Sequence, residues 1–418
     1  MKNRIFFRYI ITPLLRVRKV LYIWFYNIFT KPRLIKKIKE SKRPIKVNFL
    51  VINLGMWKSN KLFKLLLDDE RFSPSIVTSF IPGDSDDYKE YVQNSILEYF
   101  ESLGYPVIPT YDPKTKQSIN ISDIESDVVF FPQPYHDSPK VLPKNVLFGY
   151  IPYDYPIQDE EVFHNWLYQN ICWRIFAVNH DYKHKEEKFS YSKGRNVKVV
   201  GYSNADYYFD NHKIAENVWK SDDAHLKKII WAPHHSILPT DTMGQSLFLD
   251  LAESFLKLTE KYKDSCQFVF KPHPRLKDKL SQLESWGHQK TYAYYEAWKN
   301  GQNTDFVEGE YIDLFLSSDA LIHDCSSFIA EYLYTQKPVM FTIKESHDYK
   351  LEGSDQIIFD SQYKGVDIHE IEAFIENVVI AGNDPKKVER ETVLNSVLGQ
   401  NGKEMVCEKI YKEFVSLV

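Results

Sequence analysis

Three stretches in the second half of the chain carry polar side chains that could do chemistry. They are WAPHHS (231–236), FKPHPR (270–275) and DALIHDCSSFIAE (319–331). Each begins as a predicted buried strand and ends in polar residues. Ligands of open parallel sheets bind at the carboxyl ends of the strands. We therefore expect the three stretches to meet at one sheet edge and to form a ligand site there.

The stretch 319–331 has the pattern of a phosphate site. Ser326 and Ser327 follow Asp324 and open a predicted helix, whose first backbone N–H groups and serine hydroxyls can donate to phosphate oxygens. Glu331 lies one to two turns further, within reach of ribose hydroxyls. The alternative is ordinary helix capping, because Asp and Ser are preferred caps.

The stretch 270–275 is a stiff loop between two prolines. It holds Lys271, His273 and Arg275, which suit a diphosphate, and a histidine can also donate a proton to a leaving phosphate. The alternative is a turn with solvated basic side chains.

The stretch 231–236 carries His234, His235 and Ser236. Adjacent side chains on an extended chain point to opposite sides. The two histidines are therefore not expected to share a metal ion, and no third ligand stands at metal-like spacing. We predict neither a metal site nor a cofactor.

The elements that would position these residues follow an α/β pattern. Apolar runs of strand length alternate with helical patterns of about 10–20 residues, which is typical of parallel βαβ units. One set of runs lies in 46–201 and a second begins at 228, with a polar linker near 202–227. The predicted fold class is α/β, with two Rossmann-like domains facing a cleft (46–205 and 206–395) and a C-terminal helix (396–418).

Composition and motifs exclude several classes of protein. The 418 residues are 43% hydrophobic and 26% charged, an ordinary globular composition. The chain contains no G-x-G-x-x-G and no G-x-x-x-x-G-K-[ST] motif, which argues against dinucleotide redox enzymes and P-loop NTPases. Four cysteines without C-x-x-C spacing indicate neither a disulfide framework nor a zinc site, and they favour a reducing, cytoplasmic setting.

The net charge of −4 conceals a basic N-terminal arm (1–45). Residues 1–46 hold 14 Lys and Arg and one acidic residue, so the remainder carries −17. The apolar run 20–29 covers only about 15 Å as a helix, half of a membrane's hydrocarbon core. Basic and aromatic residues are interleaved, a pattern typical of an amphipathic helix on an anionic membrane surface. The alternative is a solvated basic helix packed on the acidic body; nucleic acid is not expected as a partner.

The stretches 231–236, 270–276 and 316–341 together resemble the CDP-glycerol glycerophosphotransferase family, which contains teichoic acid primases and polymerases and related capsule enzymes. The resemblance implies a GT-B fold, with an acceptor domain followed by a nucleotide-donor domain. It implies donor diphosphate contacts for His273 and phosphate contacts for Asp324, Ser326 and Ser327. It also implies a place for Glu331 near glycerol or ribose and for Ser236 near the donor.

One family motif is missing. The family's His-Gly-Thr-Pro, whose histidine is implied as general base, corresponds here to FGYIPYDYP (148–156). Asp154 is the expected substitute, with Tyr153 or Tyr155 as alternatives; a further alternative is that the enzyme uses a different acceptor.

The resulting hypothesis is transfer of glycerol phosphate, or a similar polyol phosphate, from a CDP-activated donor. The acceptor would be a hydroxyl of a lipid-linked or surface polymer, and CMP would leave at the cytoplasmic face of the membrane. Two alternatives stay open: a nucleotide-sugar glycosyltransferase of capsule or wall synthesis, and a non-catalytic membrane-bound assembly protein.

Overall fold

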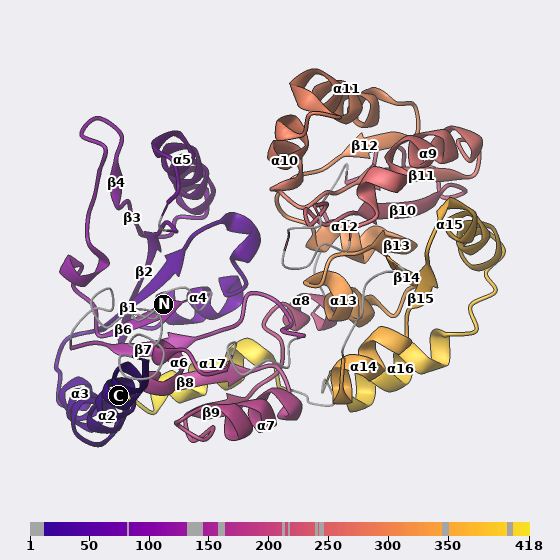
Figure 1. Cartoon of the computed structure of the whole chain (residues 1–418). Helices are drawn as coiled ribbons and strands as arrows, with labels where there is room; N and C mark the ends of the chain where they lie inside the picture. Colours follow the sequence, from indigo (N-terminus) through magenta and orange to yellow (C-terminus); the bar gives the residue numbers. More distant parts are fainter. Residues whose placement is uncertain are drawn as a thin grey trace, which may run out of the picture. The chain divides into compact units, whose positions relative to one another are not determined.

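The protein is described by a computed structural model covering residues 12–81, 83–131, 145–157, 164–210, 214–215, 218–238, 241, 246–344, 351–398 and 404–418. The chain divides into two compact units. Unit 1 comprises residues 1–206 and 402–418, and unit 2 comprises residues 207–401 (Figure 1). Among the described residues, no helix is long and apolar enough to cross a membrane.

Unit 1 is built on a parallel sheet that has seven strands in its described part, in the order β3-β2-β1-β6-β7-β8-β9. The strands are β1 (Ile45–Val51), β2 (Phe72–Thr78), β3 (Val107–Ile108), β6 (Val128–Phe131), β7 (Leu147–Tyr150), β8 (Arg174–Ala177) and β9 (Val197–Val199). A small antiparallel hairpin joins β4 (Tyr111–Asp112) to β5 (Gln117–Ser118). The helices of unit 1 include α4 (Asn60–Leu67), α5 (Asp86–Ser102), α6 (Leu167–Ile171) and α7 (His180–Phe189).

Strands covered on both faces explain the continuous apolar runs of unit 1. All four residues of β6 and all four of β7 are buried. Gly149 in β7 is required by packing, because a Cβ atom there would lie 2.2 Å from a ring carbon of Phe130 on the neighbouring strand.

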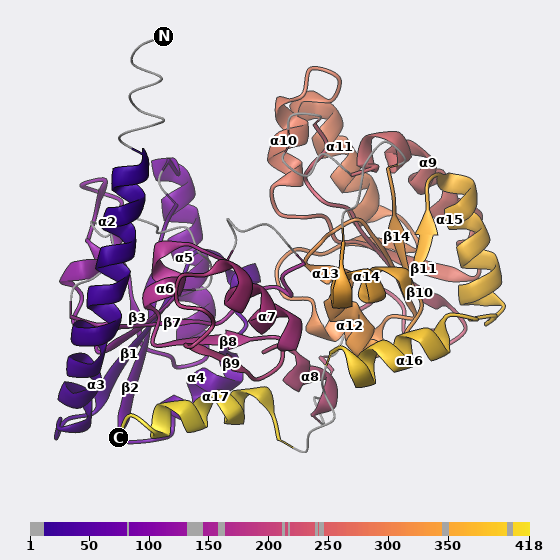
Figure 2. The same cartoon turned by 60° about the horizontal axis from the view of Figure 1, so that its bottom comes forward.

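The N-terminal arm forms a nearly continuous helix that packs on unit 1. It runs through α2 (Thr12–Phe25), a π-helical turn (Tyr26–Thr30) and α3 (Lys31–Lys39), as Figure 2 shows. Tyr26 donates from its hydroxyl to Val146 O at 2.9 Å, and Lys31 Nζ donates to Cys172 O at 2.7 Å. The arm is therefore anchored along one face. Residues 1–11 of the predicted arm lie outside the described residues.

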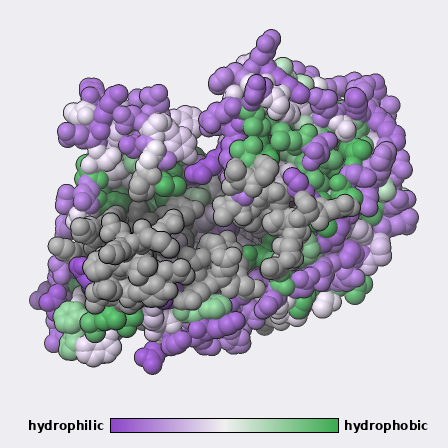
Figure 3. All heavy atoms as spheres, viewed as in Figure 1, coloured by the Kyte–Doolittle hydropathy of each residue, from purple (hydrophilic) through white to green (hydrophobic). Residues whose placement is uncertain are grey.

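The opposite face of this helix is apolar and exposed. Leu21 is 60% exposed and Trp24 56%. Other large apolar side chains exposed on the same segment are Val17, Phe25, Ile28 and Phe29. Figure 3 shows hydrophobic residues at the surface over the α2–α3 corner of unit 1. We call these six residues the arm stripe.

The last helix, α17 (Val406–Val415), completes unit 1. Phe414 is fully buried, and its ring lies 5.4 Å from that of Phe130 and 5.7 Å from that of Trp173. Asp206, which is itself buried in α8 (Ala205–Phe209), accepts the backbone N–H groups of Val406 and Cys407 and so holds the first turn of α17.

Unit 2 is a second parallel sheet, with six strands in its described part, in the order β12-β11-β10-β13-β14-β15. The strands are β10 (Lys227–Ala232), β11 (Cys266–Phe270), β12 (Thr304–Phe306), β13 (Ala320–His323), β14 (Val339–Thr342) and β15 (Tyr363–Gly365). The helices are α9 (Phe248–Lys261), α10 (Leu276–Gln282), α11 (Gly287–Asn300), α12 (Ile312–Ser317), α13 (Phe328–Glu331), α14 (Gly353–Asp360), α15 (Ile368–Phe374) and α16 (Lys387–Ser396).

An aromatic core holds β10 and β11 under the helices of unit 2. Trp231 stacks on Phe255 of α9 with ring centroids 4.1 Å apart, and Phe270 stacks on Trp298 of α11 at 5.1 Å. All four side chains are fully buried. The first residue of each of these two polar stretches is therefore held firmly, which fixes where the stretches leave the sheet. The predicted α/β class, with two units of parallel sheet, is confirmed.

Candidate ligand site at the sheet edge of unit 2

The order of strands brings the three polar stretches of unit 2 to one edge. The chain runs from β10 outward through β11 to β12, and then returns to the other side of β10 to form β13, β14 and β15. The switch point therefore lies between the carboxyl ends of β10 and β13, where open α/β sheets bind ligands. Residues 233–236 follow β10, 271–275 follow β11 and 324–327 follow β13.

Asp324 joins two of these strand ends. Its side chain is buried, and its carboxylate accepts the backbone N–H of His234 at 2.5 Å and that of Leu247 at 3.1 Å. Burial raises the pKa of this carboxyl to about 6, against the opposing effect of the hydrogen bonds that it accepts. In this structure Asp324 therefore positions the loop after β10 and the start of α9.

The two adjacent histidines lie side by side, contrary to the expectation that they point apart. The ring centroids of His234 and His235 are 4.3 Å apart. The chain leaves the strand at Pro233 and bends at His235, and Ile237 N donates to His235 O at 2.9 Å. The alternation of an extended strand therefore does not apply. Ser236 is buried, and its Oγ lies 2.7 Å from His234 Nδ1.

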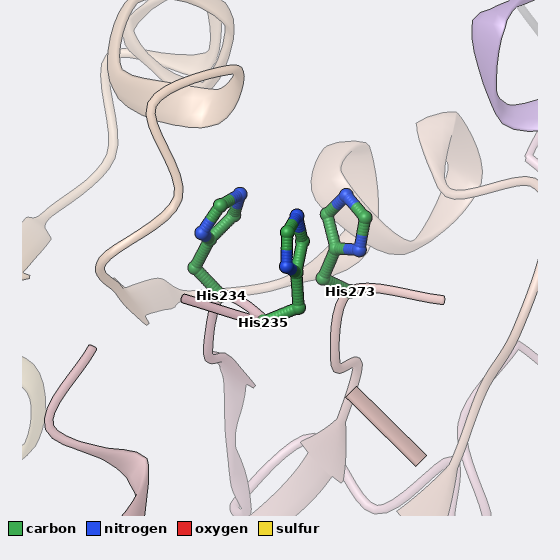
Figure 4. Close-up of side chains that lie close together, drawn as sticks. All are labelled: His234, His235 and His273. Carbon is green, nitrogen blue, oxygen red and sulfur yellow. The ribbon is translucent and has the colours of Figure 1, made fainter. Parts of the chain in front are cut away.

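His273 joins this pair from the neighbouring strand end. The centroid of its ring lies 4.9 Å from that of His234 and 4.2 Å from that of His235. Figure 4 shows the three side chains next to one another. His273 N donates to Pro233 O at 2.9 Å, which links the two loops. The backbone N–H of Arg275 donates to His273 Nδ1 at 3.1 Å, an arrangement that leaves the ring proton on Nε2.

Burial keeps the three imidazoles neutral. It lowers the pKa of His234 to about 3, of His235 to about 4 and of His273 to about 2, and the neighbouring imidazoles and basic groups act in the same direction. At neutral pH the cluster therefore offers N–H donors and lone pairs rather than positive charges.

Lys271 and Arg275 differ in exposure. Lys271 is 6% exposed, and its Nζ donates to Gly309 O at 2.9 Å and lies over the ring of Tyr311. Arg275 is exposed at the start of α10. Arg275 is thus available to an anion arriving from solvent, whereas Lys271 also braces the loop after β12.

Ser326 and Ser327 lie half-buried just before α13. Ser327 Oγ lies 3.0 Å from Cys325 Sγ. The helical segment continues from α13 into a 3₁₀ turn (Tyr332–Thr335). Both serines are therefore in the predicted position between a strand end and a helical segment.

Glu331 is buried in α13 and is held by two tyrosines that sequence reasoning missed. Its carboxylate accepts from Tyr311 Oη at 2.8 Å and from Tyr208 Oη at 3.4 Å. The contacts of both tyrosines with Glu331, and of Tyr311 with Lys271, arise only in the folded chain, so no pattern in the sequence indicated these tyrosines.

Asp154 lies in unit 1, four residues after the end of β7, and is half-buried. Tyr155 is buried, and its hydroxyl accepts from Asn179 Nδ2 at 2.5 Å. Of these two candidates for a base, Asp154 is the more accessible.

A pocket lies at the carboxyl edge of the unit 1 sheet, where β1 and β6 adjoin at its switch point. Its lining residues are Phe49, Leu50, Val51, Met56, Trp57, Lys58, Ser59, Phe130, Phe131 and Ile151. The polar members come from the loop before α4, which sequence reasoning did not single out.

Comparison with known families decides the assignment. The sequence pattern of CDP-glycerol:poly(glycerophosphate) glycerophosphotransferases matches residues 164–398, more than half of the chain. The chain belongs to this family. The resemblance seen in the sequence is confirmed, and the protein is a CDP-glycerol glycerophosphotransferase-like enzyme. The matched region contains every predicted site residue of unit 2 and excludes Asp154.

Solved structures support the fold. A variant of the wall teichoic acid polymerase TagF superposes with a TM-score of 0.58 and 12% identity, covering 97% of this chain and 96% of that one. The MnaA–UDP complex from S. aureus gives a TM-score of 0.54 and 13% identity, covering 90% and 98%. At these identities the likeness concerns the fold alone. No curated protein matches the sequence.

Proposed function

We propose that this glycerophosphotransferase-like enzyme transfers glycerol phosphate, or a similar polyol phosphate, from a CDP-activated donor to a hydroxyl of a lipid-linked or cell-surface polymer. The observation that carries the proposal is the meeting of three family stretches at the switch point of unit 2, tied together by Asp324 and His273. Family membership supports the donor class.

The proposed reaction is a displacement at phosphorus. The acceptor oxygen forms a bond to the phosphorus that bears glycerol, and the bond from this phosphorus to the bridging oxygen of the diphosphate breaks. CMP leaves with the electron pair, and the acceptor's proton passes to a base. Such reactions depend mainly on positioning and on neutralising charge.

The residues at the unit 2 edge would bind the diphosphate. The Nε2–H of His273 can donate to a phosphate oxygen, since its Nδ1 already accepts from Arg275 N. The guanidinium of Arg275 and the hydroxyls of Ser326 and Ser327 supply further donors. Glu331, fixed by its tyrosines, can accept from the hydroxyls of ribose or glycerol. Asp154 would take the acceptor proton.

Nucleotide release tests this function. Purified full-length protein is incubated with membrane vesicles and with CDP-glycerol, CDP-ribitol or a UDP-sugar, and the released nucleotide is measured. We expect CMP from a CDP-polyol, and at least a tenfold loss in His273→Ala and in the double variant Ser326→Ala/Ser327→Ala. His288→Ala, on the exposed face of α11, is the control and should keep full activity. Release from UDP-sugars alone would instead favour a glycosyltransferase, and no release from any donor would favour an assembly protein.

The arm is proposed to hold the enzyme peripherally at the cytoplasmic face of the membrane. The arm stripe supports this, because its large apolar side chains are exposed although the helix is packed on unit 1. Nearby basic residues such as Arg16, Arg18 and Lys37 are exposed as well, and each is worth about 1 kcal/mol near anionic lipids. A lipid-linked acceptor would then lie in the same membrane to which the enzyme binds.

A further inference from the structure

The cluster of His234, His235 and His273 has the make-up of a metal site. One ring nitrogen of each residue lies within 4.8 Å of the corresponding nitrogens of the other two. The side chains rise together from the ends of β10 and β11, as Figure 4 shows. Asp241 acts electrostatically on His234 and His235, but its carboxylate is already paired with Lys279.

Hydrogen bonds hold the ring of His234, whereas one ring nitrogen of His235 has no partner. The Ser236 N–H donates to His234 Nδ1 at 3.2 Å, and Ser236 Oγ lies 2.7 Å from the same atom. With a metal on Nε2, the ring proton would move to Nδ1, where Ser236 Oγ can accept it. Metal-binding histidines commonly donate their other ring N–H to such a neighbour. His235 Nδ1 is buried and has no hydrogen-bond partner among the described residues. A buried ring nitrogen without a partner is costly unless a ligand satisfies it.

We propose that His234, His235 and His273 bind one divalent transition-metal ion of the Zn²⁺ class, with a fourth coordination position left open. Imidazole nitrogens suit Zn²⁺, Co²⁺, Ni²⁺ and Cu²⁺, whereas Mg²⁺ and Ca²⁺ prefer oxygen ligands. Three protein ligands with an open position are typical of catalytic zinc sites. Tetrahedral ligands at the usual Zn–N distance lie about 3.4 Å apart, so the rings need to close by about 1 Å.

Besides the proton shift at His234, binding requires a rearrangement at His273. Its Nδ1 now accepts from Arg275 N. A metal on Nε2 would move the ring proton to Nδ1 and break this contact. With the metal on Nε2, the metal itself would contact the diphosphate in place of the Nε2–H. With the metal on Nδ1 in place of Arg275 N, the Nε2–H would stay the donor proposed above.

The charges around the cluster indicate what the open position would accept. Lys279 is paired with Asp241, and Arg275 carries a further positive charge near the rings. A metal ion would add to this positive potential. An anionic oxygen, such as that of a diphosphate, is therefore the expected fourth ligand.

Titration of the full-length protein with metal alone tests the site. The protein is first dialysed against a chelator, and Zn²⁺ binding is then measured by calorimetry and Co²⁺ binding by its visible absorption. We expect one ion per chain, a tetrahedral Co²⁺ spectrum and no comparable binding of Mg²⁺. His235→Ala and His273→Ala should each weaken binding at least tenfold, while His288→Ala, an exposed histidine of the same unit, should bind as the wild type does.

Circular dichroism verifies that each variant is folded. Absence of the Co²⁺ spectrum, or equal affinity in folded His235→Ala, would overturn the metal site. The outcome does not depend on the proposed transfer, since no nucleotide is present. A protein that binds Zn²⁺ and turns over no donor keeps this inference and loses the transferase proposal; a protein that turns over CDP-glycerol but binds no metal does the reverse.

Discussion

The carboxylate of Asp324 accepts the backbone N–H of His234 across 90 positions of sequence, at 2.5 Å. The same carboxylate accepts from Leu247 at the start of α9. One buried side chain thus ties the end of β13 to the loop that carries two histidines and to a core helix. Asp324 acts through the residues that it positions.

Replacing Asp324 should therefore affect both stability and activity. In Asp324→Asn, an amide N–H₂ replaces one acceptor oxygen and faces a backbone N–H. Leaving a buried polar group without its partner costs about 1–3 kcal/mol. We expect a lower unfolding midpoint in urea and CMP release reduced at least tenfold. Unchanged stability would contradict the positioning role. Asp278→Asn, in the exposed first turn of α10, is the control.

Asp154 should be needed for turnover but not for donor binding. Loss of a general base typically lowers rate by about 10²–10⁴-fold. We expect Asp154→Asn to reduce the transfer rate by at least about 100-fold, with the Kd for CDP-glycerol unchanged. Asp87→Asn, an exposed aspartate in the same unit, should match the wild type in both measurements. Normal turnover by Asp154→Asn would exclude it as the base.

The arm stripe should control membrane binding. Burying a large apolar side chain contributes about 1.5–3 kcal/mol, so the triple variant Leu21→Ser/Trp24→Ser/Phe25→Ser should bind vesicles at least tenfold less. Flotation with anionic lipid vesicles measures this. A control variant, Tyr91→Ser/Tyr292→Ser/Val388→Ser, removes equally exposed apolar side chains elsewhere and should float normally. Equal flotation of both variants would contradict the proposal that the arm stripe binds the membrane.

Lys31 should make stability depend on pH. Burial lowers the pKa of its ammonium to about 8, although Nζ donates to Cys172 O. Between this pH and the ordinary value of 10.5, the folded protein has lost a proton that the unfolded chain keeps, so stability rises with pH in this window. In urea unfolding between pH 7 and pH 10, the free energy of unfolding of the wild type should rise relative to that of Lys31→Met. The difference between the wild type and Lys37→Met, which replaces an exposed lysine of α3, should not change with pH.

Gly149 should not tolerate a methyl group. The added Cβ would lie 2.2 Å from the Phe130 ring. Overpacking of this kind typically costs about 1–3 kcal/mol. We expect Gly149→Ala to be destabilised by that amount, and Phe130→Leu to recover part of the loss in the double variant. Strictly additive effects of the two substitutions would argue against the clash.

The strands were predictable because parallel strands buried on both faces leave continuous apolar runs, as in β6 and β11. Other elements leave a weaker pattern. Helix α11 is hard to predict, since its buried side is aromatic (Tyr294, Tyr295 and Trp298) and Gly287 begins it without a capping side chain. Strand β15 is hard to predict as well, because it has three residues and one of them is Lys364.

The candidate site was predictable in its location but not in its internal contacts. Strand ends followed by polar residues predicted which side chains gather in unit 2. The partners of Asp324 are backbone groups of distant loops, which no local pattern reveals. The meeting of the histidines depends on the bend at His235, and this bend invalidates the alternation on which the sequence argument relied.

The return of α17 to unit 1 has a consequence for biosynthesis. Phe414 fills a hole between Phe130 and Trp173, yet it is made only after the whole of unit 2. At about 5–20 residues per second, the core of unit 1 would wait on the order of tens of seconds for its last helix. During that interval the nascent unit 1 would expose the aromatic rings of Phe130 and Trp173, a surface that a chaperone could bind.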